Sequence, residues 1–449
     1  MPDNKNLERR RSSPVVEKQV DSNIVKALTS VPSFVGSFEI IRKLGQGSFS
    51  TVILARSHEV GKEVAVKCLV PTTCPSKAFS ELDILRKLGG RCNVIGLLCT
   101  FRYEDSIFFM MDYFPHDHFT TFVHDAKFDE IRDYMKNLLI ALQHVHKLKI
   151  IHRDIKATNF LFNRTLRRYR LIDFGLAEHE EGCVKRKPDD STNLENLCGM
   201  AIKRPRLALS QRSTAEKKKL LGSVTNRFEN DDPAIATGTF AHLRRKERVS
   251  KAGTAGFRAP EVLLNYAGQT AAVDIWSAGV LFLGLLTRRY PFMKPKDDET
   301  ALAQIISIFG SESLALLAKR IGKKLICQPH ISALSIRKLI LCIRLTKKED
   351  LIRRLSENSI ENLPKEGSCS SLCPPTQCEK CERSLYCPTY SPICFCKKGD
   401  ILGCSNNGEK LEIEENFIEK SVALLEKMLT IDPKRRITAE WALKAEIFK

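Results

Sequence analysis

The chain has 449 residues, of which 43% are hydrophobic and 28% are charged, as in ordinary soluble globular proteins. Lysine and arginine number 72 against 53 acidic residues, a formal net charge of +19. This excess favours an anionic partner: nucleic acid, membrane headgroups, nucleotide phosphates or acidic protein. Eight of the 16 cysteines lie within residues 369–404, which argues against a secreted disulfide scaffold and favours an intracellular location.

The sequence also argues against a membrane protein. Its first residues lack the apolar core of a signal peptide. The strongest apolar run, residues 278–286, is far shorter than the roughly 20 residues that cross a bilayer. We expect this run to form a buried helix.

The hydrophobic pattern predicts strands first and helices afterwards. Residues 1–35 are polar and are expected to form a flexible tail. Alternating apolar and polar residues predict antiparallel strands at 38–57, 62–70, 95–101 and 106–114. Helical spacing predicts helices at 79–88, at 128–146 and through most of the chain after Glu261. This order predicts an α+β fold.

Two long stretches lack this periodicity. Residues 178–251 are highly charged, and residues 346–412 contain the cysteine-rich region. Both are longer than ordinary loops inside a compact domain. We therefore predict that they are insertions into one domain rather than domains of their own.

Residues 45–52 read Gly-Gln-Gly-Ser-Phe-Ser-Thr-Val between two predicted strands. Glycines in such a turn let backbone N–H groups approach phosphate oxygens. An ordinary tight turn is the alternative, because Ser50 stands where the usual third glycine would be. A dinucleotide-binding turn is excluded, since a strand follows instead of a helix.

Lys67 directly follows the apolar residues Val-Ala-Val of a predicted strand, and Glu81 lies on the helix predicted next. A strand lysine can simply extend its amine to solvent. Held by Glu81, it could instead direct its ammonium toward α- and β-phosphates.

The most informative pattern is Ile-His-Arg-Asp-Ile-Lys-Ala-Thr-Asn at 151–159, followed by Asp-Phe-Gly at 173–175. Asp154 can orient a hydroxyl and accept its proton, and Lys156 can stabilise a transferring phosphoryl group. Asn159 and Asp173 offer hard oxygen ligands to Mg²⁺. These spacings predict phosphoryl transfer.

Three later motifs complete a resemblance to the eukaryotic protein kinase family. They are Gly-Thr-Ala-Gly-Phe-Arg-Ala-Pro-Glu at 253–261, Asp-Ile-Trp-Ser-Ala-Gly at 274–279 and Leu-Thr-Ile-Asp-Pro-Lys-Arg-Arg-Ile-Thr-Ala at 429–439. The resemblance implies a bilobal kinase domain over residues 36–449, with a β-rich N-lobe, a helical C-lobe and both insertions in the C-lobe. Lys156 implies serine/threonine rather than tyrosine specificity.

The resemblance also implies roles for individual residues. Lys67 and Glu81 would form the ion pair of the active state, Asp154 would be the catalytic base, and Asn159 and Asp173 would hold Mg²⁺. Met111 would be the gatekeeper beside a hinge at 112–114, and Glu261 and Arg436 a buried structural pair. The implied ATP-binding set is Leu44, Gly45, Gln46, Gly47, Ser48, Phe49, Ser50, Val52, Ala65, Lys67, Met111, Asp112, Phe114 and Leu161.

Within this family, the chain is most similar to the cell division cycle 7-related kinases. The similarity rests on the Gly-x-Gly-x-Phe-Ser loop, on residues 152–163, 253–263 and 297–305, and on the positions of the two insertions. Ala157, Thr158 and Ala255 depart from the family's usual Pro-Ser and Pro. The resemblance implies a Dbf-type regulatory subunit and a role in starting DNA replication through the minichromosome maintenance helicase.

The resemblance further implies substrates with an acidic or phosphorylated residue after the phosphoacceptor serine. Lys251, Thr254 and Arg258 match the positions that face this P+1 residue. Two cations there favour a carboxylate or a phosphate. The alternative is that Arg258 only pairs within the activation segment.

The insertions suggest a location and a second metal. Basic clusters at 185–188 and 203–206 predict either a nuclear-import signal or a solvated charge run, and we expect a nuclear protein. A Zn²⁺ site or a metal-free cysteine-rich loop would account for Cys378, Cys381, Cys394 and Cys396. No phosphorylation site is evident opposite Arg153, which favours switching by a subunit. Ser210, Ser213, Thr214 and Ser250 stay open as phosphorylation sites.

Three functions stay open. The first is a nuclear, subunit-activated serine/threonine kinase that acts on acidic sites in replication proteins. The second is an acidophilic kinase of the casein-kinase-two type that is active alone. The third is a catalytically silent kinase-fold scaffold on chromatin. We expect no membrane association and no direct nucleic-acid binding, because acidic substrates account for the charge.

Overall fold

The computed structural model describes residue 28 and residues 31–47, 50–69, 75–103, 106–180, 252–345 and 410–449. All of them belong to one compact unit, Met1–Lys185 with Val249–Lys449, and the other unit, Arg186–Arg248, lies outside them. Most of both predicted insertions lies outside the described residues. The same is true of the predicted nuclear-import clusters and of the four cysteines suggested for Zn²⁺.

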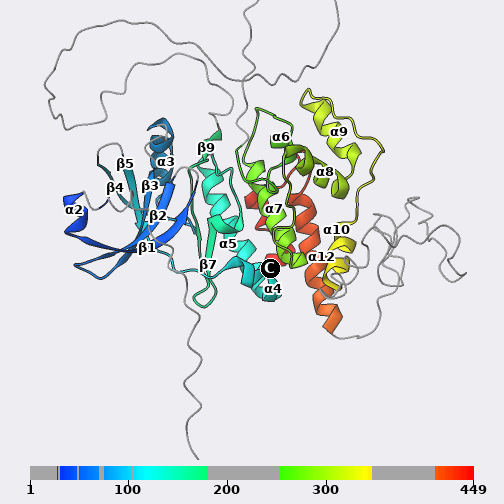
Figure 1. The fold of residues 1–449 in the computed structure, drawn as a ribbon. Helices are drawn as coiled ribbons and strands as arrows, with labels where there is room; N and C mark the ends of the chain where they lie inside the picture. Colours follow the sequence, from blue (N-terminus) through cyan, green and yellow to red (C-terminus); the bar gives the residue numbers. More distant parts are fainter. Residues whose placement is uncertain are drawn as a thin grey trace, which may run out of the picture. The chain divides into compact units, whose positions relative to one another are not determined.

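A five-stranded sheet forms the N-lobe (Figure 1). Its strand order is β1-β2-β3-β5-β4, and all neighbours are antiparallel. The strands are β1 (Phe38–Gln46), β2 (Ser50–Ser57), β3 (Glu63–Leu69), β4 (Leu97–Tyr103) and β5 (Ser106–Asp112), with helix α3 (Pro75–Leu88) between β3 and β4. The strands and the helix expected from the hydrophobic pattern are confirmed.

The two faces of this sheet differ, because successive side chains along a strand point to opposite sides. One face builds a core cluster of its own, which includes Ile53, Val64, Val66, Phe108 and Met110. The other face carries Val52, Ala65 and Met111, which are only half-buried, together with the buried Lys67. The second face is therefore the one that holds the predicted nucleotide-binding residues.

The structure corrects the end of the predicted tail at residues 1–35. Leu28, Val31 and Phe34 are buried in the core cluster on the outer sheet face, and α2 spans Pro32–Val35. The Phe34 ring stacks on Phe38 with centroids 5.2 Å apart. The physical reason is that an apolar sheet face gains free energy when apolar side chains cover it.

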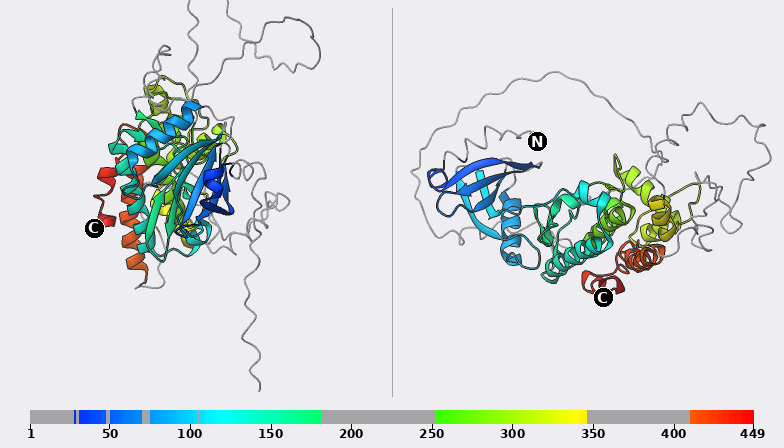
Figure 2. Two further views of the ribbon diagram at one scale, coloured as in Figure 1. Left: turned by 90° about the vertical axis from the view of Figure 1, so that its left-hand side faces the viewer. Right: turned by 90° about the horizontal axis from the view of Figure 1, so that it is seen from below.

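The C-lobe is helical, and three long helices pack together in it (Figure 2). α7 (Ala272–Thr287) contacts both α5 (Phe128–Lys147) and α12 (Lys410–Met428) and is buried from Val273 to Thr287. The prediction of a buried helix at 278–286 is confirmed. Among the described residues, none of the helices is both long and apolar enough to span a bilayer.

The remaining helices of the lobe are shorter. They are α4 (Phe119–Asp125), α6 (Pro260–Leu263), α8 (Asp298–Phe309), α9 (Ser311–Arg320), α10 (Ile336–Leu345), α13 (Ala439–Ala442) and the 3₁₀ turn η4 (Glu446–Phe448). Together with the sheet they give the α+β, two-lobed kinase fold that the sequence predicted.

Two short β-ribbons lie between α5 and α6. β6 (Ile150–Ile151) pairs with β9 (Glu178–His179), and β7 (Phe160–Asn163) pairs with β8 (Arg168–Leu171); η1 (Ala157–Asn159) precedes β7. β9 places the first residues of the predicted insertion 178–251 in the domain itself, and α12 does so for the last residues of 346–412. Both limits were missed because these ends are polar and show no periodicity of their own.

Candidate active site

Lys67 joins the two lobes through a chain of charges. Its Nζ lies 2.6 Å from Glu81 Oε1 on α3 and 2.9 Å from Asp173 Oδ1, after β8. Both Lys67 and Glu81 are buried, whereas the Asp173 side chain is 48% exposed. The predicted Lys67–Glu81 pair is thus formed, and it holds Asp173 at its other end.

Lys67 and Asp173 stabilise each other's charges, whereas burial outweighs the Lys67 ammonium at Glu81 and raises the pKa of that carboxyl. Burial alone would lower the pKa of Lys67, but the carboxylates of Glu81 and Asp173 outweigh it and raise that pKa. Burial raises the pKa of Asp173, and the Lys67 ammonium overcomes this, so the pKa lies below its ordinary value. Lys67 is therefore a cation and Asp173 a carboxylate near neutral pH.

Asp154 is held from several sides in the loop between β6 and η1. Its Oδ1 accepts hydrogen bonds from the backbone N–H and the hydroxyl of Thr254, at 3.0 and 2.6 Å. Its Oδ2 accepts one from Asn159 Nδ2 at 3.0 Å and lies 2.7 Å from Lys156 Nζ. Lys156 Nζ also donates to Thr254 Oγ1 at 2.8 Å. The structure therefore assembles Asp154, Lys156 and Asn159 in one cluster, as predicted, and adds Thr254.

Asn159 and Asp173 are suited to share a hard cation. Asn159 uses its Nδ2 group to donate to Asp154. Its side-chain amide oxygen accepts no hydrogen bond from the described residues. Asp173 accepts from Lys67 and Gly175 through Oδ1, which leaves Oδ2. Mg²⁺ typically takes one or two such protein oxygens and completes its octahedron with phosphate and water. These two residues fit that pattern.

Zn²⁺ has no comparable support. Among the described residues, no group of three or more histidine, cysteine, aspartate or glutamate side chains is placed to hold a metal ion. Cys378, Cys381, Cys394 and Cys396 lie outside those residues.

Asp274, at the start of α7, anchors the loop that carries Asp154. Its carboxylate accepts the backbone N–H groups of His152 and Arg153, each at 2.8 Å, and His146 Nε2 lies 2.9 Å from it. Burial raises the pKa of Asp274, but these hydrogen bonds prevail and lower it. Asp274 was predicted only as part of a motif, because its distance along the chain from residue 153 concealed this role.

Part of the predicted ATP-binding set lies on one face of the N-lobe sheet, the face that also carries Lys67. Val52, Ala65 and Met111 share that face, and Leu44 and Leu161 are half-buried. A Cβ added at Gly45 would meet no atom within 4 Å, and at Gly47 it would lie 3.7 Å from the Ser50 carbonyl. The loop therefore keeps open space beside its backbone.

The remaining residues of the predicted ATP-binding set each have different surroundings. Gln46 accepts a hydrogen bond from Lys43, Asp112 pairs with Lys62 at 2.7 Å, and the Phe114 ring lies under Arg170. Ser50 begins β2. Ser48 and Phe49 lie outside the described residues.

Arg258 is engaged on two sides at the predicted P+1 position. Its Nε donates to the Gly253 carbonyl at 2.9 Å, and its Nη1 donates to Asp298 Oδ1 on α8 at 2.6 Å. No hydrogen bond of the Nη2 group is found among the described residues. Lys251 lies outside those residues.

Glu261 and Arg436 form the buried pair that the motifs predicted. Arg436 donates through Nη1 and Nη2 to the two carboxylate oxygens of Glu261, at 2.7 and 3.0 Å. The guanidinium also lies over the Trp276 ring, 5.2 Å from its centroid. This pair ties α6, which contains Glu261, to the segment after α12.

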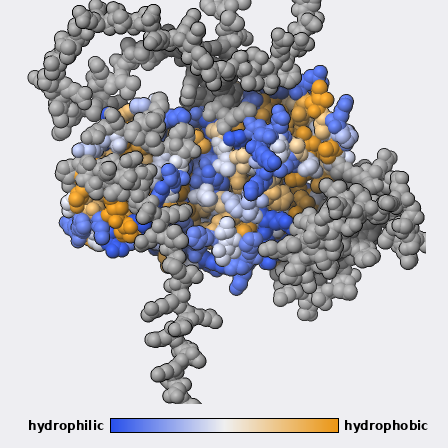
Figure 3. Space-filling model, viewed as in Figure 1, coloured by the Kyte–Doolittle hydropathy of each residue, from blue (hydrophilic) through white to orange (hydrophobic). Residues whose placement is uncertain are grey.

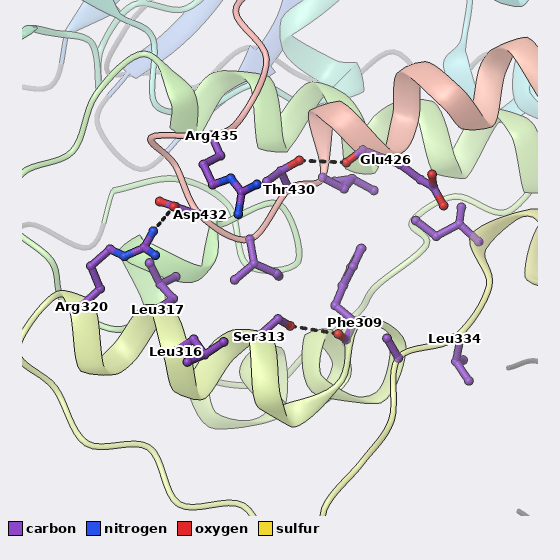
Figure 4. Close-up of a pocket in the computed structure, with 14 residues that line it drawn as sticks. Phe309, Ser313, Leu316, Leu317, Arg320, Leu334, Glu426, Thr430, Asp432 and Arg435 are labelled. Carbon is purple, nitrogen blue, oxygen red and sulfur yellow. Dashed lines mark hydrogen bonds and ion pairs between the residues drawn. The ribbon is translucent and has the colours of Figure 1, made fainter. Parts of the chain in front are cut away.

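A pocket of about 370 Å³ lies elsewhere in the C-lobe, between α9 and the segment after α12 (Figure 4). Arg320 and Asp432 form an ion pair at its rim, and Ser313 donates to the Phe309 carbonyl at 3.0 Å. Figure 3 shows a hydrophobic area over α9, where Leu316 is 58% exposed. None of the predicted ATP-site or catalytic residues lines this pocket.

Comparisons with known proteins agree with this geometry. Residues 38–199 and 238–364 match the family described as "Protein kinase domain". The chain is 31% identical to the "Cell division cycle 7-related protein kinase" of Homo sapiens, across 96% of this chain and 92% of that protein.

Two further relatives come from a fly and a microsporidian. A "non-specific serine/threonine protein kinase" of Drosophila melanogaster is 31% identical, across 93% of this chain and 69% of that protein. The "Probable cell division control protein 7 homolog 2" of Encephalitozoon cuniculi is 39% identical, across 63% of this chain and 74% of that protein.

Proposed function

The chain belongs to the protein kinase family and, within it, to the cell division cycle 7-related serine/threonine kinases, and from that premise we propose roles for its site residues, a substrate class and a partner. As a protein kinase it uses ATP and Mg²⁺ to phosphorylate a serine or threonine hydroxyl. The observation that carries the proposal is the cluster of Asp154, Lys156 and Thr254, in which each side chain contacts the other two.

In this proposal Asp154 orients the attacking hydroxyl and accepts its proton. Lys156, 2.7 Å from Asp154 Oδ2, stabilises the negative charge on the phosphoryl group in transfer. Lys67 holds the α- and β-phosphates, and Glu81 keeps its ammonium in place. Mg²⁺, when bound at Asn159 and Asp173, neutralises charge that develops on the phosphates.

Asp154→Asn tests these roles. It keeps an oxygen for Thr254 but cannot accept a proton, so we expect a loss of at least about a hundredfold in kcat. ATP binding, measured with a fluorescent ATP analogue, should stay within about twofold, because Asp154 is assigned to the hydroxyl and not to the nucleotide. A variant with near-normal kcat would contradict the assignment.

The proposed substrates are serines followed by an acidic or phosphorylated residue. Arg258 supports this choice, because Gly253, its backbone partner, directly precedes Thr254 at the base. Lys251 would add a second cation. An arginine beside the phosphoacceptor site favours a carboxylate or a phosphate on the substrate.

Matched peptides with Ser-Glu, Ser-phosphoserine and Ser-Ala test this specificity. We expect the double variant Lys251→Ala/Arg258→Ala to lose the preference for the two anionic peptides while keeping activity on Ser-Ala. An unchanged preference would refute the P+1 assignment. Residues other than Lys251 and Arg258 would then recognise the anionic group of the substrate.

We further propose activation by a Dbf-type subunit, a nuclear location and the minichromosome maintenance helicase as substrate. Family membership supports all three, and the position of Glu81 on α3 supports the first, because a protein docked against α3 would act directly on the Lys67 pair. Replacement of the basic residues at 185–187 and 203–206 should move the protein out of the nucleus.

Phosphate transfer to helicase subunits, with and without a co-expressed regulatory subunit, separates the alternatives. Strong stimulation by the subunit supports the proposal. Full activity of the chain alone favours an acidophilic kinase of the casein-kinase-two type. No transfer in either condition favours a chromatin scaffold with a kinase fold.

A further inference from the structure

Arg153 is a buried cation that directly precedes Asp154, the proposed base. Its side chain is 5% exposed, its φ is +68°, and its backbone N–H is held by Asp274. A guanidinium buried in this way destabilises the protein strongly unless an anion is close to it.

Glu178 is that anion. Its Oε2 lies 2.8 Å from Arg153 Nη1, and Gln269 Oε1 accepts from Nη2 at 3.3 Å. Glu178 belongs to β9, where it pairs with Ile151 of β6, two residues before Arg153. It also follows the Asp-Phe-Gly motif at 173–175 closely. The carboxylate therefore links the segment after the Mg²⁺ ligand to the loop that carries Asp154.

The same arginine also limits the position of the P+1 segment. A Cβ at Gly253, where φ is +98°, would lie 2.7 Å from the Arg153 carbonyl oxygen, so the two backbones are in close contact. Gly253 precedes Thr254, which bonds to Asp154. A shift of Arg153 would therefore move both Asp154 and Thr254.

In kinases that are switched by phosphorylation, the anion that orders the activation segment is a phosphate paired with arginine. We propose that Glu178 supplies this charge permanently, as a positioning residue that acts through Arg153, so that the catalytic loop is set without phosphorylation of the chain. The inference rests on the proposed role of Asp154 and extends it from catalysis to regulation.

The experiment compares Glu178→Gln with the matched control Glu180→Gln. Glu180 lies two residues away on the same segment, but its carboxylate pairs with the exposed Lys149 at 3.7 Å. Both variants are assayed as full chains co-expressed with the regulatory subunit, on a Ser-Glu peptide. We expect Glu178→Gln to lower kcat about ten- to a hundredfold, with KM for ATP unchanged within about twofold. Glu180→Gln should retain normal kcat, and Glu178→Asp should recover part of the loss.

A second measurement needs no variant. Wild-type protein treated with a protein phosphatase, and shown by mass spectrometry to lack phosphate, should keep its kcat. Loss of activity on dephosphorylation, or normal kcat in a folded Glu178→Gln variant, would overturn the inference. Failure of the role proposed for Asp154 would instead show as near-normal kcat in the Asp154→Asn variant, so the two can be distinguished.

Discussion

Thr254 is the residue for which the structure changes the interpretation most. The sequence placed it among the residues that face the P+1 position, yet its hydroxyl donates to Asp154 Oδ1 at 2.6 Å and accepts from Lys156 at 2.8 Å. It therefore holds the proposed base and the proposed phosphoryl-stabilising lysine in a fixed relative position.

We predict that Thr254→Ala lowers kcat about tenfold or more, because two hydrogen bonds to charged groups are lost. Thr254→Ser keeps the hydroxyl and should stay within about threefold of the wild type. Steady-state kinetics with a Ser-Glu peptide provides the measurement. Equal losses in the alanine and serine variants would mean that the methyl group, and not the hydroxyl, is what matters.

At the scale of elements, the catalytic loop depends on α7. The loop itself has little regular structure, and Asp274 supplies acceptors for two of its backbone N–H groups from the first turn of that helix. A buried carboxylate with several donors stabilises a protein only while it is ionised.

Asp274→Asn should lower the free energy of unfolding by about 3 kcal/mol at pH 7, because an amide NH₂ replaces an acceptor among donors. The pKa of Asp274 is lowered from 3.8. Its contribution is therefore present above pH 3.8 and is lost as the pH falls through the lower folded-state value. Urea unfolding should show the gap between wild type and variant narrowing in acid.

The exposed Asp83, which pairs with Lys87 on α3, gives the control. Asp83→Asn should change the free energy of unfolding by less than about 1 kcal/mol. A comparable loss in both variants would indicate a general charge effect rather than anchoring of the loop.

The contact between the N-terminal segment and the sheet gives another prediction at this scale. Phe34 is 4% exposed and packs on Phe38 and Phe101, whereas its neighbour Val35 is 46% exposed. Phe34→Ala should lower the free energy of unfolding by about 3 kcal/mol. Val35→Ala should lower it by less than about 0.5 kcal/mol. Thermal unfolding of the two variants tests the contact, and equal stabilities would show that the segment does not hold the sheet.

At the scale of the whole molecule, the sequence predicted residues in short local motifs better than contacts between distant parts of the chain. Lys67, Asp154, Asn159 and Asp173 could be found from the sequence, because the chemistry of phosphoryl transfer requires their types at short spacings. Glu178 and Asp274 could not be assigned their roles in this way. Each acts on the loop at 152–154 from another part of the fold, through contacts that no periodicity reports.

The ion pair between Glu261 and Arg436 is another contact of this kind, and the predicted insertion 346–412 lies between its members. Both side chains are almost fully buried, at 1% and 0% exposed. Arg436 also donates to the carbonyls of Thr430, Ala272 and Ile431. The pair and these hydrogen bonds therefore connect α6, the start of α7 and the segment after α12.

We predict that Glu261→Gln and Arg436→Met each lower the free energy of unfolding by about 3–5 kcal/mol, since each leaves a buried polar or charged group without its partner. The double variant should lose about 2 kcal/mol less than the sum of the two, because no unpaired charge remains. Recovery should be incomplete, because the three carbonyls still lack a donor. Denaturant unfolding followed by tryptophan fluorescence, to which the buried Trp276 under the guanidinium contributes, measures all three variants. Strict additivity would mean that the two residues stabilise the lobe independently and not as a charge pair.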